Sequence, residues 1–171
     1  MCIRDRINHY TRKIGMDYDD NGQLSRKGVV NDMLLSELHN LSFYKEKPPK
    51  SLGLEWVQME VIPLIEKFQL EIKDILRTLV EHIAIQIHLN TKTKKKSSLL
   101  VTGGGAFNGF LMERIKGLSS NKVVVPDSLV VNYKEALIFA FLGVLKFRNE
   151  INCLSSVTGA SKDHSTGKIY L

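Results

Sequence analysis

A short apolar run followed by three consecutive glycines is the feature that most constrains how this chain folds. Residues 99–101 predict a buried strand, Gly103, Gly104 and Gly105 a tight turn, and residues 106–116 a helix. Glycine lacks a Cβ, so such a turn can adopt positive φ and let a ligand approach its backbone closely. The N–H groups and positive dipole end of the next helix would face the turn and favour an anion, most often phosphate. The pattern predicts nucleotide binding, and the alternative is a tight strand-to-helix connection without a ligand.

The composition is that of an ordinary globular protein. The 171 residues suffice for one domain with a core, and 43% are hydrophobic and 25% charged. The longest strongly apolar run, residues 136–145, is shorter than a membrane span, so we expect no membrane contact. Cys2 and Cys153 have no metal-ligand spacing, and no secretory leader is apparent. We therefore expect a cytoplasmic protein and no metal site built from these residues.

The net charge of +6 comes mainly from one short stretch. Four lysines in residues 92–96 supply most of it, and no aromatic residue is interleaved with them. Nucleic-acid binding requires a basic face with stacking partners. We interpret this stretch as a solvated loop and expect no nucleic-acid partner.

Residues 1–6 look foreign to the rest of the chain. They can be back-translated as ATG TGT ATA AGA GAC AG plus one base, which resembles the end of a transposase adapter. We expect an adapter-derived segment at 1–6 and, at 7–171, the C-terminal part of an incomplete domain. Only two short strands are predicted, at 99–101 and 122–125, and two short strands do not make a stable sheet alone.

Four further helices are predicted from apolar periodicity. They lie at 29–39, after Ser51 as the N-cap, at 71–89 and at 133–148. The last is apolar nearly all round, so we expect more than one neighbour to bury it. On the helix at 71–89, we expect a solvated face rather than a site for Glu81, His82 and His88.

Residues 17–22 invite comparison with a calcium loop. Asp17, Asp19 and Asn21 alternate, and Gly22 stands at the sixth position. The twelfth position, which needs a bidentate glutamate, is Gly28. We therefore reject calcium binding.

Two known nucleotide-binding motifs contain a glycine turn like this one. A Walker P-loop requires Lys-Ser or Lys-Thr after its last glycine, which this sequence lacks. A dinucleotide fingerprint fits better, since Asn108 takes the place of its third glycine and Asp127 follows a second strand. That fold also needs further strand–helix–strand units, and only one helix and a tail follow Asp127.

Four separated segments resemble a family of sugar kinases in the same order. They are LLVTGGGAFNGFLM at 99–112, PPKS-x-G-x-E at 48–55, the pairs Glu135-Ala136 and Phe139-Ala140, and SVTGA at 156–160. In this order they resemble anhydro-N-acetylmuramic acid kinase, from about residue 7 to the C-terminus. The resemblance implies a helix-rich α/β fold, the C-terminal part of an actin-like (ribonuclease H-like) ATPase domain, with only part of its sheet present.

The resemblance also implies a reaction. The family uses ATP and Mg²⁺ to phosphorylate 1,6-anhydro-N-acetylmuramic acid and opens its anhydro ring with water, which gives N-acetylmuramic acid 6-phosphate for cell-wall recycling. Glu135 would contact the sugar, because a carboxylate suits paired hydroxyls, or would be an exposed helix residue. By the same resemblance, the nucleotide would be held by Thr102, Gly103, Gly104, Gly105 and Asn108.

The sequence departs from the family pattern in two places. The N-terminal phosphate-binding glycine segment and the segment carrying the aspartate base are not present, so we assign no catalytic residue. Leu54 stands where the family commonly has arginine. Two alternatives stay open: a fragment of an NAD-dependent oxidoreductase and a non-catalytic helical interaction module. A homodimer is a further candidate assembly.

Overall fold

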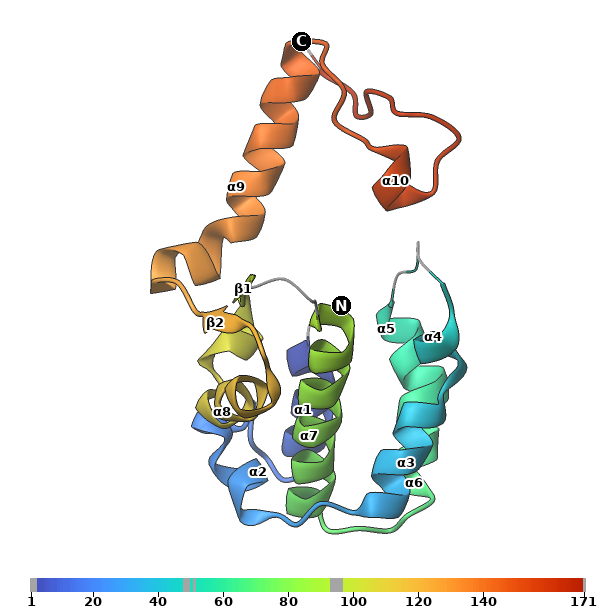
Figure 1. Ribbon diagram of the computed structural model, residues 1–171, viewed down its shortest axis with the longest axis vertical. Coiled ribbons are helices and arrows are strands. Elements are labelled where there is room, and N and C mark those ends of the chain that lie inside the picture. Colours follow the sequence, from blue (N-terminus) through green and yellow to red (C-terminus); the bar gives the residue numbers. More distant parts are fainter. Residues whose placement is uncertain (1–2, 48–49, 51, 93–96, 171) are drawn as a thin grey trace.

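Helices make up most of the molecule in the computed structural model, which describes residues 3–47, 50, 52–92 and 97–170 (Figure 1). The first half of the chain contains α1 (Ile3–Arg12), η1 (Asp20–Gly22), α2 (Gln23–Lys27), α3 (Asp32–Asn40), α4 (Ser42–Lys45), α5 (Leu54–Trp56), the π-turn η2 (Val57–Val61), α6 (Ile62–Glu66) and α7 (Ile72–Thr91). The second half contains β1 (Ser98–Leu100), η3 (Gly104–Phe107), α8 (Gly109–Leu118), β2 (Lys122–Val124), α9 (Ser128–Phe147) and α10 (Ser155–Thr158).

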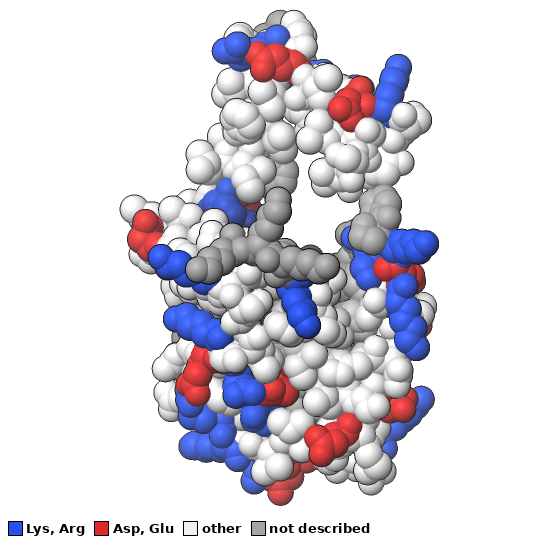
Figure 2. All heavy atoms as spheres, viewed as in Figure 1, with Lys and Arg blue, Asp and Glu red and all other residues white. Residues whose placement is uncertain are grey.

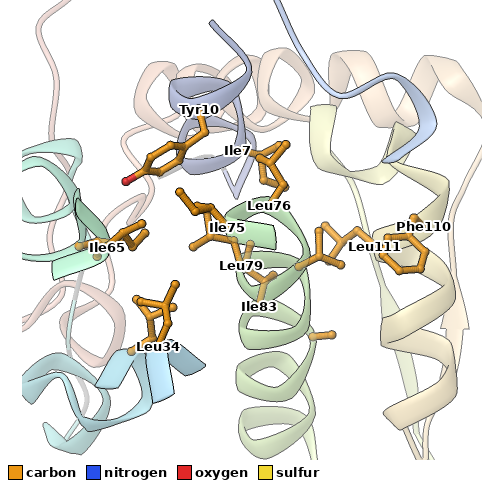
Figure 3. Packing of buried hydrophobic residues seen from close by; sticks show 14 of the residues in the cluster. Ile7, Tyr10, Leu34, Ile65, Ile75, Leu76, Leu79, Ile83, Phe110 and Leu111 are labelled. Carbon is orange, nitrogen blue, oxygen red and sulfur yellow. The ribbon is translucent and has the colours of Figure 1, made fainter. Parts of the chain in front are cut away.

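The helix α7 lies at the centre of the core, and the sequence predicted it closely. Leu76, Leu79 and Val80 are fully buried on it. Figure 3 shows Leu34 of α3 and Ile65 of α6 on one side of α7, and Leu111 and Phe110 of α8 on the other. The apolar stripe of α7 therefore joins both halves of the helical body through one continuous cluster.

The two predicted strands are confirmed and pair in parallel, but the predicted burial of the first strand is wrong, because Leu100 is 58% exposed and Leu99 only half-buried. Leu99 is in register with Val123, and the N–H of Val101 extends the pairing by donating to the carbonyl of Val124 at 2.9 Å. The connection between β1 and β2 runs through α8, as parallel pairing requires. The helix-rich α/β class with a small sheet is confirmed.

The helices before α7 match the predictions in part. The predicted helix at 29–39 begins later, at Asp32, because the side chain of Asn31 accepts a hydrogen bond from the N–H of Leu34 at 2.9 Å and caps it. The predicted N-cap Ser51 lies outside the described residues. Leu54 is exposed at the start of α5, whereas Val57, Val61 and Ile65 further along are buried.

The prediction of a solvated face for Glu81 and His82 is wrong, because α8 and α3 cover that side of α7. Glu81 is buried and accepts two hydrogen bonds from Arg114, at 2.8 and 2.9 Å, and one from Arg77 at 2.7 Å. Burial raises the pKa of Glu81, but its hydrogen bonds with Arg114 and Arg77 together lower the pKa below its usual range. Glu81 is therefore a charged anchor between α7 and α8.

His82 is fully buried beside a second histidine. Its Nε2 lies 3.0 Å from the hydroxyl of Tyr44, and its ring lies 4.9 Å from that of His39. Burial, and then the charges of His39 and Arg6, lower the pKa of His82 to about 3. This histidine is neutral at physiological pH and belongs to the core. His88, the third residue of the predicted solvated face, is half-buried.

The helix α9 departs most from its prediction. It begins at Ser128 rather than Tyr133, because the carboxylate of Asp127 accepts a hydrogen bond from the N–H of Val130 at 3.0 Å and caps it. It was expected to be buried nearly all round, but Val131 is its one buried residue among those described. Only its first turns contact the body, through η3, and the rest extends away from it (Figure 1). Most of its apolar side chains are exposed, among them Leu137, Phe139 and Phe147.

The length of α9 also corrects the expectation from the apolar run at 136–145. The helix has 20 residues, and an 18-residue stretch of it has a mean hydropathy of 1.6, so by length and composition alone it is long and apolar enough to cross a membrane. A core helix of a globular protein has the same properties.

Figure 2 shows acidic and basic side chains intermingled over the helical body on the face in view, and few charges along α9.

Candidate functional site

The glycine turn lies between β1 and α8 and is fixed at its first residue. Gly103 has φ +79°, a conformation that side chains with a Cβ rarely adopt. Its N–H donates to the carbonyl of Val131 at 3.2 Å, which ties the turn to the first turn of α9. The chain then winds through the short 3-10 turn η3, where the N–H of Ala106 donates to the carbonyl of Gly103 at 2.9 Å.

A pocket of about 850 Å³ opens beside this turn. Its walls come from the glycine turn, the loop at 17–21, the side of α1 and the first two turns of α9. Of the predicted site residues, the pocket brings together Gly103, Gly104, Gly105, Asn108 and Glu135. Thr102 does not line it. The volume lies in the range of small-molecule sites.

The prediction that the next helix points free N–H groups at the turn is wrong. The helix α8 begins at Gly109 rather than at residue 106, and side chains occupy its first donors. The N–H of Gly109 donates to Asn21 Oδ1 at 3.0 Å, and the N–H of Leu111 donates to Asn108 Oδ1 at 2.9 Å. Asn108 is thus the N-cap of α8 as well as part of the pocket wall.

The unpaired donors of the turn lie one step earlier, in η3. Within the described ranges, the backbone N–H groups of Gly104 and Gly105 have no protein acceptor. Both residues line the pocket. Two adjacent N–H groups at the start of a helical turn suit an anionic or carbonyl oxygen of a ligand.

Sequence reasoning missed the loop at 17–21 as a pocket wall. Asp19 is buried, and its carboxylate accepts hydrogen bonds from the N–H of Leu24 at 2.8 Å, the N–H of Ser25 at 2.9 Å and the hydroxyl of Ser25. Both of its oxygens therefore hold the start of α2. The spacing of Asp19 and Gly22 is the signal for this loop in the sequence, although it does not complete a calcium loop.

Glu135 reaches the pocket from the second turn of α9. It is exposed and shares this wall with Asn132 and Lys134. The earlier start of α9 removes Glu135 from the first turn, where it was expected. Asp127, which a dinucleotide site would use to bind ribose, caps α9 instead and does not line the pocket. That removes the acidic residue on which the NAD interpretation depended.

No group of three or more His, Cys, Asp or Glu side chains that could hold a metal ion occurs in the described part of the chain. Asp17 and Asp20 line the pocket beside Asp19, whose oxygens are occupied. Arg12 and Lys134 contribute positive charge to the same walls. The pocket is therefore polar and of mixed charge, which suits a ligand that carries phosphates and hydroxyls.

The described elements define a helix-rich α/β protein with a polar pocket beside a glycine turn. The sequence model described as anhydro-N-acetylmuramic acid kinase matches residues 5–171. The chain belongs to the anhydro-N-acetylmuramic acid kinase family.

Three curated relatives have that same name. The protein of Mannheimia succiniciproducens is 34% identical over 170 residues, which cover 91% of this chain and 45% of the relative. That of Sulfurimonas denitrificans is 32% identical over 168 residues, 91% of this chain and 46% of its own length. That of Haemophilus influenzae is 34% identical over 179 residues, with coverage of 91% and 46%. The chain spans about half the length of the curated relatives it matches.

Proposed function

We propose that this chain supplies one wall of the active site of an ATP-dependent kinase acting on 1,6-anhydro-N-acetylmuramic acid. The observation that carries the proposal is the shared pocket: the glycine turn at Gly103 and the carboxylate of Glu135, 32 positions further on in the sequence, face one cavity. Family membership supports the class of reaction. In this proposal the fold is the C-terminal part of an actin-like ATPase domain, with a sheet completed by other segments of the kinase.

The nucleotide would lie against the glycine turn. The N–H groups of Gly104 and Gly105 would donate to its oxygen atoms, and the bare backbone of Gly103 would allow close approach. Asn108 would contribute its amide group while its Oδ1 caps α8. Thr102 precedes the turn but does not line the pocket. It would therefore position the backbone of Gly103 rather than contact the nucleotide.

Magnesium would enter with the phosphates of ATP. Mg²⁺ commonly keeps several waters and binds one or two carboxylates together with substrate phosphates. Asp17 and Asp20 on the loop wall and Glu135 on α9 line the same pocket, and their carboxylates would be available for that role. The ion would offset the charge that develops on the transferred phosphoryl group.

Glu135 would orient the sugar. Its two carboxylate oxygens can accept hydrogen bonds from neighbouring hydroxyls. In the overall reaction, the C1–O6 bond of the anhydro sugar breaks, a water oxygen joins C1, and O6 receives the γ-phosphoryl group of ATP. The base that takes the proton of that water would come from another segment of the kinase, because we assign no such residue in this chain. We propose a cytoplasmic enzyme of cell-wall recycling without nucleic-acid or membrane partners, and a homodimer as its candidate assembly.

The test is a fusion of residues 7–171 to the N-terminal part of the Haemophilus influenzae relative. We expect ATP-dependent phosphorylation of 1,6-anhydro-N-acetylmuramic acid by the fusion and no turnover by the 171-residue chain alone. Phosphoryl transfer depends on positioning, so both walls and the base are needed together. Turnover by the lone chain would contradict the division of the site. A folded fusion that binds ATP but does not phosphorylate this sugar would contradict the proposed substrate. A fusion that binds NAD instead of ATP would favour the oxidoreductase alternative.

A further inference from the structure

The side chain of Asn21 joins two walls of the pocket that are far apart in the sequence. Asn21 belongs to the loop wall, and its Oδ1 accepts a hydrogen bond from the N–H of Gly109 at 3.0 Å, across 88 positions of sequence. Gly109 is the first residue of α8 and follows the glycine turn closely. This bond occupies a donor that a helix leaves unpaired at its N-terminus.

The backbone around Asn21 is adapted to this contact. Asn21 has φ +52°, in the left-handed region that Asn tolerates better than most residues with a Cβ. Gly22 follows with φ +72°. A Cβ on Gly22 would lie 2.4 Å from Asn108 Oδ1 and 2.5 Å from the Cβ of Phe110, so a larger residue would push the two segments apart.

The contact between the loop and α8 is also close at Gly109. A Cβ on Gly109 would lie 2.1 Å from Asn21 Oδ1. The loop and the start of α8 therefore fit together with a glycine on each side of the interface. Neither segment can shift along the other without breaking the Asn21–Gly109 hydrogen bond.

The loop that carries Asn21 is itself anchored to the helical body. Asp19 holds it to α2 through the backbone of Leu24 and Ser25. From α2, Arg26 hydrogen-bonds to Glu113 of α8 at 2.6 Å, and its guanidinium lies 4.5 Å from the ring centre of Phe110. Asn21 thus projects from a fixed base rather than from a free loop.

The same bond reaches the glycine turn through the backbone. Asn108 precedes Gly109, and its N–H donates to the carbonyl of Gly105 at 3.2 Å. At the other end of the turn, the N–H of Gly103 donates to the carbonyl of Val131. The turn is held at both ends: by α9 at Gly103, and by Asn21, through Gly109 and Asn108, at Gly105.

We infer that Asn21 is a positioning residue for the nucleotide-binding turn, and this inference rests on the proposed function. By fixing Gly109, it sets the direction of the Gly104 and Gly105 N–H groups toward the nucleotide. Asn21 acts through the turn and makes no contact with the reacting atoms.

The test compares glycine and aspartate variants in the fusion kinase. Asn21→Gly relieves the positive φ but removes the acceptor that fixes Gly109, and we expect it to weaken ATP binding and raise the KM for ATP by up to about tenfold, the effect of one lost hydrogen bond. Asn21→Asp keeps an acceptor and tolerates the same backbone, so we expect the hydrogen bond to Gly109 to persist, while the negative charge added to the pocket wall weakens ATP binding by repulsion that added salt reduces. The KM for the sugar should change less than the KM for ATP in both variants.

Asn149 provides the matched control. It is also an exposed asparagine with positive φ, +57°, but it follows α9 and does not line the pocket. Asn149→Gly should therefore leave ATP binding unchanged. A general loss of stability would lower ATP affinity in both glycine variants alike, and that result would overturn the inference.

Two direct measurements separate this inference from the proposed function. Titration with a fluorescent ATP analogue reports nucleotide affinity whether or not the sugar is phosphorylated. Hydrogen exchange at the Gly109 amide should accelerate in Asn21→Gly and stay slow in Asn21→Asp. Faster exchange with unchanged ATP affinity would overturn the positioning role, whereas absent sugar turnover in the parent fusion with intact ATP binding would count against the substrate alone.

Discussion

Two helices of equal length behave in opposite ways in this molecule. Both α7 and α9 have 20 residues, and α9 is the more apolar of the two. In α7, nine residues are buried, including the polar Thr78, Glu81 and His82, whereas Val131 is the one buried residue that the structure describes in α9. Burial therefore follows from the neighbours that surround a helix and not from its composition.

The contrast has a functional consequence. The helix α7 and the helices around it form a frame with its own core, on which α8 and the loop at 17–22 are fixed. The helix α9 contacts that frame at its first turns, where Val131 meets the glycine turn and Glu135 lines the pocket. We propose that the rest of α9 is covered by segments of the kinase that this chain does not contain. We expect the apolar face of α9 to make the lone chain prone to aggregate.

The largest expected effect is on the core of α7. Leu79→Ala should lower the free energy of unfolding of the chain by about 2–5 kcal/mol, because it leaves a cavity at a fully buried position. Urea unfolding followed by circular dichroism measures the loss. The matched control is Leu137→Ala on α9, which is 70% exposed and should change stability by less than about 0.5 kcal/mol. Equal losses in the two variants would contradict the contrast between the helices.

The same substitution in the complete kinase tests whether other segments cover α9. In the fusion kinase, we expect Leu137→Ala to lower the free energy of unfolding by more than about 1 kcal/mol. A leucine that neighbouring segments cover loses its packing contacts when its side chain is shortened to that of alanine. Thermal unfolding of the fusion with and without the substitution measures it. If Leu137→Ala stayed neutral in the fusion, α9 would be free of neighbours there too, and the proposed cover would be wrong.

The next effect is on sugar kinetics and concerns Glu135, near the N-terminus of α9. Glu135→Gln in the fusion kinase should raise the KM for the sugar or lower kcat by about ten- to a hundredfold, as loss of a charged hydrogen bond predicts, with the KM for ATP nearly unchanged. Steady-state kinetics with each substrate varied separates the two. Glu150→Gln, at an exposed carboxylate outside the pocket, is the control and should match the parent. Unchanged sugar kinetics in Glu135→Gln would return Glu135 to the role of a surface residue.

The next effect is a pH dependence in the frame around α7. The pKa of His82 is about 3 in the folded chain against a usual 6.5, so the unfolded chain binds the proton more readily. The stability that neutral His82 contributes is therefore full above pH 6.5 and falls as the pH is lowered toward 3, by about 2 kcal/mol between pH 7 and pH 5. Burial lowers the pKa of His39 and that of His9 as well, so both add in the same direction.

Urea midpoints at pH 7 and pH 5 measure this dependence. His82→Gln should reduce the difference between the two midpoints, while His164→Gln, at an exposed position on the tail, should leave it unchanged. A difference that persists in His82→Gln would place the titrating group elsewhere.

The smallest expected effect on stability is at the exposed face of α9. Leu137→Lys should leave the free energy of unfolding of the chain within about 0.5 kcal/mol and raise its solubility, because it breaks an apolar surface that has no cover among the described residues. Light scattering at increasing protein concentration measures the change. Equal scattering by the parent chain and the variant would remove α9 as the source of aggregation.

Local patterns in the sequence predicted the frame and the glycine turn well. The stripe of α7 and the paired strands at Leu99 and Val123 follow from period and propensity, which act over a few residues. The four motifs predicted the family, and Gly103 and Glu135 do meet in one pocket. Whether they bind nucleotide and sugar stays a prediction.

The features that sequence reasoning missed depend on partners distant in the sequence. Glu81 is buried because Arg114 arrives from α8, 33 positions away, and His82 because Tyr44 covers it from 38 positions away. The caps supplied by Asn21 and Asn108 moved the start of α8 and occupied donors assigned to an anion. A helical period shows which face of a helix is apolar, but only tertiary contacts show which polar side chains that face can also bury.

The most direct test of the central claim is amide hydrogen exchange at the glycine turn of the fusion kinase. We expect ATP to slow exchange at the Gly104 and Gly105 N–H groups, which have no protein acceptor among the described residues, and to leave the already bonded Gly109 N–H nearly unchanged. Exchange at Gly104 and Gly105 that stays fast in saturating ATP, in a fusion that still phosphorylates the sugar, would contradict the assignment of this turn to the nucleotide.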